Sequence, residues 1–225
     1  ECDECEKACP TQAIRFEKGK GIRLDLGRCL FCTECVTACP EKAIQYTTDH
    51  RMATRVREDL VIDGKTAEMH LAAALDKKMK SVLGRSLKLR QVAAGDGGGC
   101  ALELQALNNV VFDLGRFGIQ FVASPRHADG ILLTGPITEN MKLALRKTYE
   151  AVPAPKLVIA VGACAISGGP FQGSPAIHRG ADDAVDASDL LLQWAALSRA
   201  LDTPDFDAAE YTDPDTGEFT SDDLL

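Results

Sequence analysis

A duplicated cysteine pattern at the start of the chain constrains its fold more than any other feature. The first 39 residues contain seven of the nine cysteines. The two copies read Cys2-Asp-Glu-Cys5-Glu-Lys-Ala-Cys9-Pro10 and Cys29-Leu-Phe-Cys32-Thr-Glu-Cys35-Val-Thr-Ala-Cys39-Pro40. A segment this short buries too little apolar surface to fold unaided, so its stability must come from whatever the cysteines bind.

The spacing Cys-x2-Cys-x2-Cys-x3-Cys-Pro is typical of bacterial ferredoxins, in which one run donates three ligands to one [4Fe–4S] cluster and its fourth cysteine to another. We therefore interpret residues 1–46 as a bacterial-type ferredoxin domain with an α+β, ferredoxin-like fold and two [4Fe–4S] clusters. One cluster is expected to have a complete ligand set, made of Cys9, Cys29, Cys32 and Cys35.

The second cluster is expected on Cys2, Cys5 and Cys39, with its fourth ligand before residue 1. The first repeat lacks its opening cysteine, so a site with three cysteines is the alternative. Zinc also binds Cys-x2-Cys pairs and is the competing metal. Zinc motifs do not repeat a three-cysteine run that ends in Cys-Pro, which favours the clusters. The clustered spacing also favours metal in a reducing compartment over disulfides.

The next part of the chain, residues 47–90, is interpreted as a basic connector with a docking helix over Thr66–Leu83. Apolar residues recur there at helical spacing, at Leu71, Leu75 and Met79. Residues 202–225 contain nine acidic residues and no Lys or Arg, and a solvated tail is predicted for them.

Apolar runs and helical patterns alternate over residues 91–201. The runs predict buried strands at Ile119–Val122, Ile131–Thr134 and Leu157–Val161, and the patterns predict helices at Glu139–Val152 and Ala187–Leu201. Strand–helix alternation predicts an α/β domain with a parallel sheet. Functional residues of such domains lie at the carboxyl ends of the strands.

Composition excludes several classes of protein. Outside the acidic tail the chain is near neutral, because the tail carries nine of the acidic residues behind the net charge of −8. Aromatic residues make up 5% and no basic stripe exists, so a nucleic-acid partner is not expected. No apolar run reaches the roughly 18 residues of a membrane-spanning helix.

Several long motifs in the second half resemble a known family. They are Gly84-Arg-Ser-Leu-Lys-Leu-Arg-Gln-Val92, Ser124-Pro-Arg-His-Ala-Asp129, Thr134-Gly-Pro136 and Tyr149-Glu-Ala-Val-Pro-Ala-Pro-Lys-Leu-Val-Ile-Ala-Val-Gly-Ala-Cys164-Ala-Ile-Ser-Gly-Gly169. This stretch resembles the small, cluster-bearing subunit of membrane-bound [NiFe] hydrogenases and formate hydrogenlyases, and the 20 kDa-type B subunit of respiratory complex I.

The resemblance implies a flavodoxin-like domain that holds one further [4Fe–4S] cluster beside a partner subunit. It also implies a large subunit and membrane-arm subunits as partners, a soluble electron donor or acceptor, and a place on the cytoplasmic side of the membrane through those partners. An attached ferredoxin domain fits the same electron-transfer setting.

The chain departs from the family at the ligands of that further cluster. Cys100 and Cys164 match the second and third family cysteines, whereas glycine occupies the first position, at Gly97 or Gly99. The strand and the Pro-Gly-Cys-Pro-Pro turn that carry the fourth are expected to be deleted after Gly180. Two thiolates cannot hold a cubane cluster, so we expect this third cluster to be absent. Cys100 and Cys164 would then be small side chains in a remnant pocket, with a disulfide as the alternative.

Two functional hypotheses follow. The first is an iron–sulfur electron-transfer subunit of a hydrogenase- or complex-I-related membrane complex. The second is a redox-inactive scaffold subunit of a related complex that retains the ferredoxin clusters. The α/β domain shows no acid–base set and no nucleophile elbow, so catalysis within this chain alone is not expected.

Overall fold

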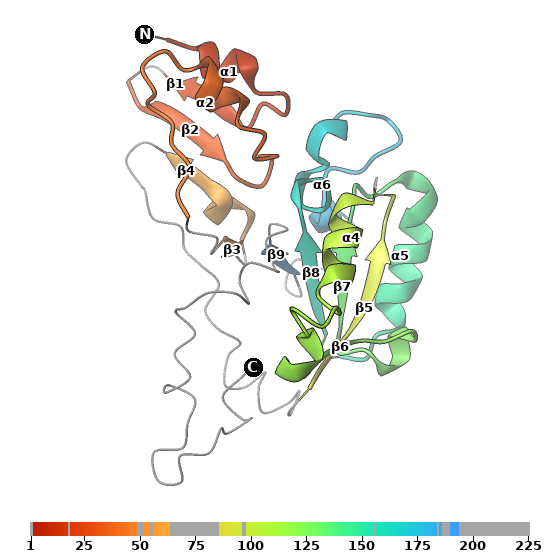
Figure 1. Ribbon diagram of the computed structural model, residues 1–225. Helices are drawn as coiled ribbons and strands as arrows, with labels where there is room; N and C mark the ends of the chain where they lie inside the picture. The colour runs from red at the N-terminus through yellow and green to blue at the C-terminus, as the bar shows by residue number, and fades with distance from the viewer. Residues whose placement is uncertain are drawn as a thin grey trace.

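The computed structural model describes residues 2–17, 19–48, 52–54, 56–63, 86–95, 98–154, 156–183, 185 and 190–193. Within these residues the chain forms a small three-stranded sheet and a larger six-stranded sheet. Figure 1 shows the small sheet and its two helices beside the upper end of the large one.

The small sheet belongs to the cysteine-rich segment. Strands β1 (Ile14–Glu17) and β2 (Gly21–Asp25) form an antiparallel hairpin, and β4 (Val61–Asp63) pairs with the other edge of β2. The short helices α1 (Glu4–Ala8) and α2 (Glu34–Ala38) pack against each other. The predicted ferredoxin-like module therefore includes a strand from the segment that we interpreted as a connector.

The segment before β4 also connects the two sheets. Strand β3 (Ala53–Thr54) pairs antiparallel with an edge strand of the large sheet. The 3-10 helix η1 (Arg57–Leu60) then returns the chain to β4. The docking helix predicted over Thr66–Leu83 and the acidic tail lie outside the described residues.

The large sheet has the topology of a flavodoxin-like domain. Its parallel strands are β5 (Leu87–Ala93), β6 (Ile119–Phe121), β7 (Gly130–Thr134), β8 (Leu157–Val161) and β9 (Leu190–Gln193). Their spatial order is β6-β5-β7-β8-β9, with β3 beyond β9. Numbered along the chain, this order is 2-1-3-4-5, the flavodoxin arrangement. The predicted α/β domain with a parallel sheet is confirmed.

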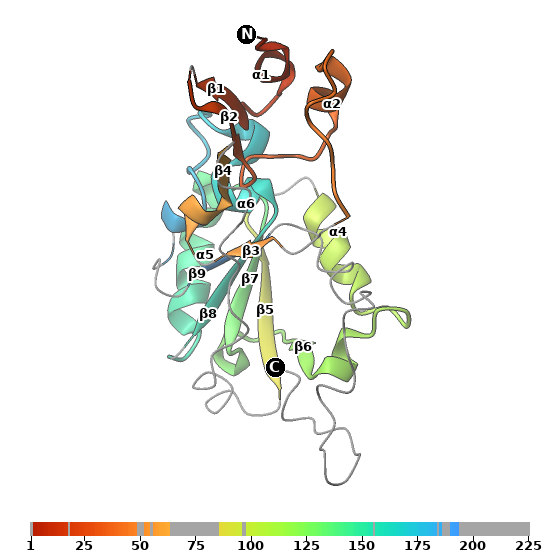
Figure 2. The same ribbon diagram turned by 90° about the vertical axis from the view of Figure 1, so that its left-hand side faces the viewer.

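Helices cover both faces of the large sheet, as Figure 2 shows. Helix α4 (Gly99–Ala106) lies on one face and α5 (Glu139–Ala151) on the other. Strand β7 is buried along its whole length because it packs against both layers. Ile131 and Leu133 join the core that contains Leu145 of α5, whereas Leu132 joins the core that contains Leu104 of α4.

The sequence-based strand and helix predictions agree with β6, β7, β8 and α5 to within a residue at each end. Strand β5 was not predicted, because Lys88 and Arg90 interrupt the apolar residues of this segment. Lys88 is exposed and Arg90 only half-buried, while Leu87 and Leu89 point into the core.

The helix predicted over Ala187–Leu201 is wrong where the structure can test it. Residues Leu190–Gln193 form β9, which pairs in parallel with β8 from Val158 to Val161. Three consecutive leucines suit a strand beside β8 as well as a helix, and pairing with the sheet decided between them. The strand expected to be deleted is therefore present.

A glycine at the start of β7 allows the central strands to approach closely. A Cβ atom at Gly130 would collide with the carbonyl oxygen of Leu157 on β8 and lie 3.1 Å from its Cβ atom. We expect Gly130→Ala to destabilise the fold by about 1–3 kcal/mol through overpacking, lowering the melting temperature by several degrees. Gly115→Ala is the control, because its Cβ would meet only Asp113 Oδ1, at 3.8 Å. Equal melting temperatures for the two variants would contradict this packing argument.

Candidate metal centre

The duplicated cysteine sequence produces a duplicated local structure. Cys5 lies on α1 and Cys35 on α2, while Cys9 and Cys39 are the residues at which these helices end. Both end residues leave the helix in extended backbone, at φ −76° and −82°. The proline that follows each of them cannot continue the helix.

Backbone N–H groups point at three of the cysteine sulfurs. The amides of Ala13 and Ala43 donate to Cys9 Sγ and Cys39 Sγ at 3.2 and 3.3 Å, four residues along in each repeat. In the second repeat the Phe31 amide also donates to Cys29 Sγ at 3.3 Å. Donors of this kind stabilise negative charge on a thiolate and on a cluster that it binds.

Unusual backbone conformations make these donations possible. Gln12 and Lys42, at equivalent places in the two repeats, have φ of 53° and 51°. Phe31 and Thr33, within the second repeat, have φ of 55° and 65°. Non-glycine residues adopt positive φ at a cost, and such residues concentrate at binding sites. The loops are therefore shaped to turn their amides toward the sulfurs.

The thiols of the two repeats interleave. Burial, together with smaller contributions from the thiolates of Cys9, Cys35 and Cys32, raises the pKa of the Cys29 thiol to about 11, so these three sulfurs lie within electrostatic reach of Cys29. Burial likewise raises the pKa of Cys5, with smaller contributions from Cys39 and Cys2. We call the first set the four-cysteine site and the second set the three-cysteine site.

The ferredoxin spacing predicts that each repeat contributes its last cysteine to the other repeat's cluster, and this assignment stays a prediction. None of the nine cysteines forms a disulfide. Within the described part of the chain, no three His, Cys, Asp or Glu side chains lie close enough to bind one metal ion. A cubane cluster is larger than a single ion and holds its four ligands farther apart. The thiol chemistry and the amide donors of both sites fit such a cluster.

Two aromatic residues beside the four-cysteine site were not predicted. Burial raises the pKa of the Tyr46 hydroxyl, and the nearby Cys29 and Cys35 thiolates act in the same direction. The Tyr46 ring meets the Phe31 ring edge to face, with centroids 5.9 Å apart. No spacing rule marks Tyr46, because its contact depends on how the chain returns after the second repeat.

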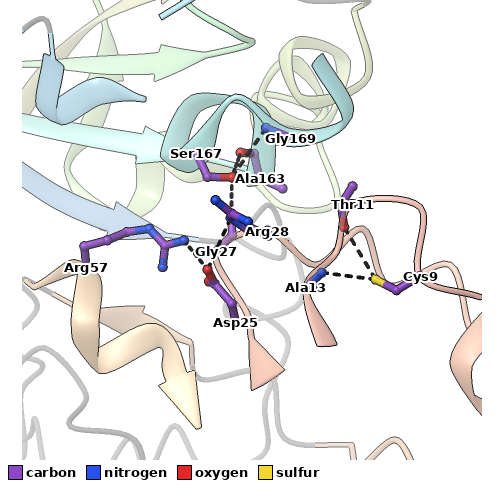
Figure 3. A network of polar contacts seen from close by, with 10 residues as sticks. All are labelled: Cys9, Thr11, Ala13, Asp25, Gly27, Arg28, Arg57, Ala163, Ser167 and Gly169. Atoms are coloured by element: carbon purple, nitrogen blue, oxygen red, sulfur yellow. Dashed lines mark hydrogen bonds and ion pairs between the residues drawn. The ribbon is translucent and has the colours of Figure 1, made fainter. Parts of the chain in front are cut away.

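The four-cysteine site lies beside the α/β domain. Figure 3 shows Ser167 of α6 (Ala163–Ser167) reaching Gly27, two residues before Cys29. The Ser167 hydroxyl donates to the Gly27 carbonyl oxygen at 2.9 Å in a buried position. Leu26 is part of the core around β7 and β8, and Phe31 packs against that core.

Cys100 and Cys164 lie at the carboxyl edge of the large sheet. Cys100 is in the first turn of α4, which follows β5, and Cys164 is in the first turn of α6, which follows β8. Strand β7 lies between β5 and β8, and β5 and β7 form the switch point of this topology. The predicted disulfide alternative is wrong, since both residues are thiols.

Cys164 has a close backbone neighbour at Gly169. A Cβ atom at Gly169 would lie 2.9 Å from Cys164 Sγ. The hydroxyl of Thr134, at the end of β7, is buried and has no hydrogen-bond partner among the described residues. Gly97 lies outside those residues. Residues 194–225, which follow β9, contain no cysteine.

Comparisons with known proteins agree with this two-part organisation. Residues 98–196 match the family model of the NADH ubiquinone oxidoreductase 20 kDa subunit, and residues 1–43 match that of a 4Fe-4S dicluster domain. In the part of the chain that the structure describes, no helix is both long and apolar enough to cross a membrane.

Curated relatives match part of the chain. The chain is 43% identical over 93 residues to the "Probable membrane-bound hydrogenase subunit mbhJ" of Pyrococcus furiosus, covering 41% of this chain and 56% of that protein. It is 37% identical over 135 residues to formate hydrogenlyase subunit 7 of Escherichia coli, covering 60% and 51%. It is 48% identical over 84 residues to the NADH-quinone oxidoreductase B subunit of Clostridium beijerinckii, covering 37% and 50%.

The chain thus spans about half the length of these relatives. The matched motifs, the 2-1-3-4-5 sheet and the interleaved cysteine repeats agree on the family of each part. Residues 98–196 belong to the family of the NADH ubiquinone oxidoreductase 20 kDa subunit, and residues 1–43 belong to the 4Fe-4S dicluster domain family.

Proposed function

We propose that this chain is an iron–sulfur electron-transfer subunit of a membrane oxidoreductase complex related to hydrogenases and complex I. Its partners would be a hydrogenase-like or complex-I-like large subunit and membrane-arm subunits. These would hold it at the cytoplasmic side of the membrane, and a soluble protein could donate or accept its electrons. The names of the relatives support this setting, because they are subunits of a membrane-bound hydrogenase, a formate hydrogenlyase and an NADH-quinone oxidoreductase.

The observation that carries the proposal is the docking of the four-cysteine site on the α/β domain. The Gly27–Ser167 hydrogen bond is buried, and Leu26 belongs to the same core as Ile131 and Leu133 of β7. The two parts therefore form a continuous core rather than two domains on a loose linker. An electron carrier needs such a fixed distance between its redox centre and the next acceptor.

The residues of the module have distinct roles in this proposal. Cys9, Cys29, Cys32 and Cys35 would hold one [4Fe–4S] cluster, and Cys2, Cys5 and Cys39 would hold the other with one further ligand. Such a cluster accepts and releases single electrons when bound. The amides of Ala13, Phe31 and Ala43 stabilise the negative charge at the ligand sulfurs.

We further propose that the α/β domain holds no cluster of its own. Cys100 and Cys164 are the two thiolates at the carboxyl edge of its sheet, and residues 194–225 contain no cysteine. Carboxylates are poor substitutes, because oxygen ligands suit harder cations than cluster iron. The four-cysteine site would then be the last relay before the partner subunit.

A scaffold subunit without redox function is the second candidate, and the same shortage of thiolates favours it. The test uses the complex as it purifies anaerobically with its partner subunits. The clusters are first reduced with dithionite, and the excess is removed. Addition of an electron acceptor that the partner subunit uses should then oxidise the clusters, and the EPR signals of the reduced [4Fe–4S] clusters should disappear. Signals that persist unchanged while the partner turns over would overturn the electron-transfer proposal and favour the scaffold.

A further inference from the structure

A group of three charged side chains lies where the ferredoxin module meets the α/β domain. Arg57 Nη2 donates to Asp25 Oδ2 at 2.7 Å, and Arg28 Nε lies 3.5 Å from the same oxygen. The three side chains are only 21–23% exposed. Figure 3 shows the three charged groups gathered beside Gly27. We call Asp25, Arg28 and Arg57 the junction group.

Packing fixes the position of Arg57. A Cβ atom at Gly27 would lie 2.7 Å from Arg57 Cζ and Nη1, so the guanidinium lies directly against the Gly27 backbone. The neighbouring amide of Leu26 donates to the Leu60 carbonyl at 2.8 Å, which joins η1 to the same loop. Arg57 is thus held against a residue that lies two positions before Cys29, the first ligand of the second repeat.

Among the ion pairs of the described residues, the junction group has one more positive than negative charge. One carboxylate faces two guanidinium groups, and arginine stays protonated at any ordinary pH. Asp25 Oδ1 and Arg57 Nη1 are buried without a hydrogen-bond partner among the described residues. Burial weakens screening by salt, so this charge acts on its surroundings more strongly than an exposed one.

The charged side chains beside the three-cysteine site are mostly exposed, so salt screens them. Helix α1 and its preceding residue contribute Asp3, Glu4 and Glu6 against one cation, Lys7, which pairs with Asp3 at 2.8 Å and Glu4 at 3.2 Å. Glu34, between Cys32 and Cys35, is an acidic residue within the four-cysteine motif, but it is exposed and therefore screened. The buried positive charge of the junction group is thus the main electrostatic difference between the two sites.

We propose that the junction group makes the cluster of the four-cysteine site the easier of the two to reduce. Positive charge beside a cluster favours its reduced state, because reduction adds a negative charge. One electron would leave the cluster of the three-cysteine site, which is oxidised, and enter that of the four-cysteine site, which is reduced, with no proton transferred. Arg57 is then a positioning residue that directs electrons toward the α/β domain.

This inference rests on the proposed function, since it requires both clusters. The test is a redox titration of the complete protein followed by EPR, on wild type, Arg57→Met and Arg57→Lys. Arg23→Met is the matched control: it also removes one arginine of the module, but Arg23 is 54% exposed and lies 3.7 Å from Glu17. The EPR signal that disappears in Cys32→Ala is assigned to the cluster of the four-cysteine site.

Arg57→Met should move the midpoint potential of that component to a more negative value and leave the other component unchanged. Arg57→Lys should retain most of the wild-type potential, because it keeps the charge. Unchanged potentials in Arg57→Met, an equal shift of both components, or an equal shift in Arg23→Met would each overturn the inference. Iron is measured in every sample to keep the two proposals apart. A wild-type protein without two clusters contradicts the proposed function. Two clusters together with an unchanged midpoint potential in Arg57→Met contradict only the role of Arg57.

Discussion

Replacement of Cys32 by alanine is expected to remove about half of the iron, from about eight to about four iron ions per chain. Cys32 is exposed, so its loss leaves no cavity in the fold. The loss comes from the four-cysteine site alone, because Cys2, Cys5 and Cys39 keep the other cluster. The measurement is iron and acid-labile sulfide per chain on anaerobically purified protein, with EPR of the reduced sample.

The matched variants are Cys100→Ala and Cys164→Ala, which should leave the iron content at the wild-type value. These two residues lie at the carboxyl edge of the large sheet, in the domain that we propose to be without a cluster. A wild-type content of about twelve iron ions, falling by about four in either variant, would show that a third cluster exists. The chain would then be a complete relay up to its partner subunit.

Removal of iron is expected to unfold the ferredoxin module and leave the large sheet folded. Among the described residues of 2–48, the buried apolar side chains are only Cys5, Ala13, Ile14 and Leu26. So small a core cannot offset the entropy of ordering the loops around the sulfurs. The large sheet instead has cores on both faces, built mostly from residues outside the module.

Amide hydrogen exchange before and after chelation under reducing conditions measures this difference. The amides of Ala13, Phe31 and Ala43, which donate to cysteine sulfurs, should lose their protection. The amides of β7 and β8 serve as the internal control and should keep theirs. Retained protection at the three sulfur-bonded amides would mean that the module folds without clusters, and loss at β7 and β8 would mean that the two parts unfold as one unit.

Local sequence patterns determined much of this organisation. The cysteine spacing predicts which thiols of the two repeats come together, because the tight loops leave few ways to surround a cluster. The apolar runs at Ile131–Thr134 and Leu157–Val161 predict central strands, since only a strand buried on both faces tolerates uninterrupted apolar residues. The order of the strands in the sheet was implied only by the family resemblance.

Tertiary structure alone decided the rest. Leu190–Gln193 could form a strand or a helix by its own preferences, and pairing with β8 made it a strand. Strand β4 comes from a segment with no cysteine, yet it completes the sheet of the ferredoxin module. The contacts of Arg57 with Asp25 and of Ser167 with Gly27 join residues far apart in the sequence, and no local pattern marks such contacts. Its formation depends on packing around Gly27, where the absence of a side chain leaves room for the guanidinium.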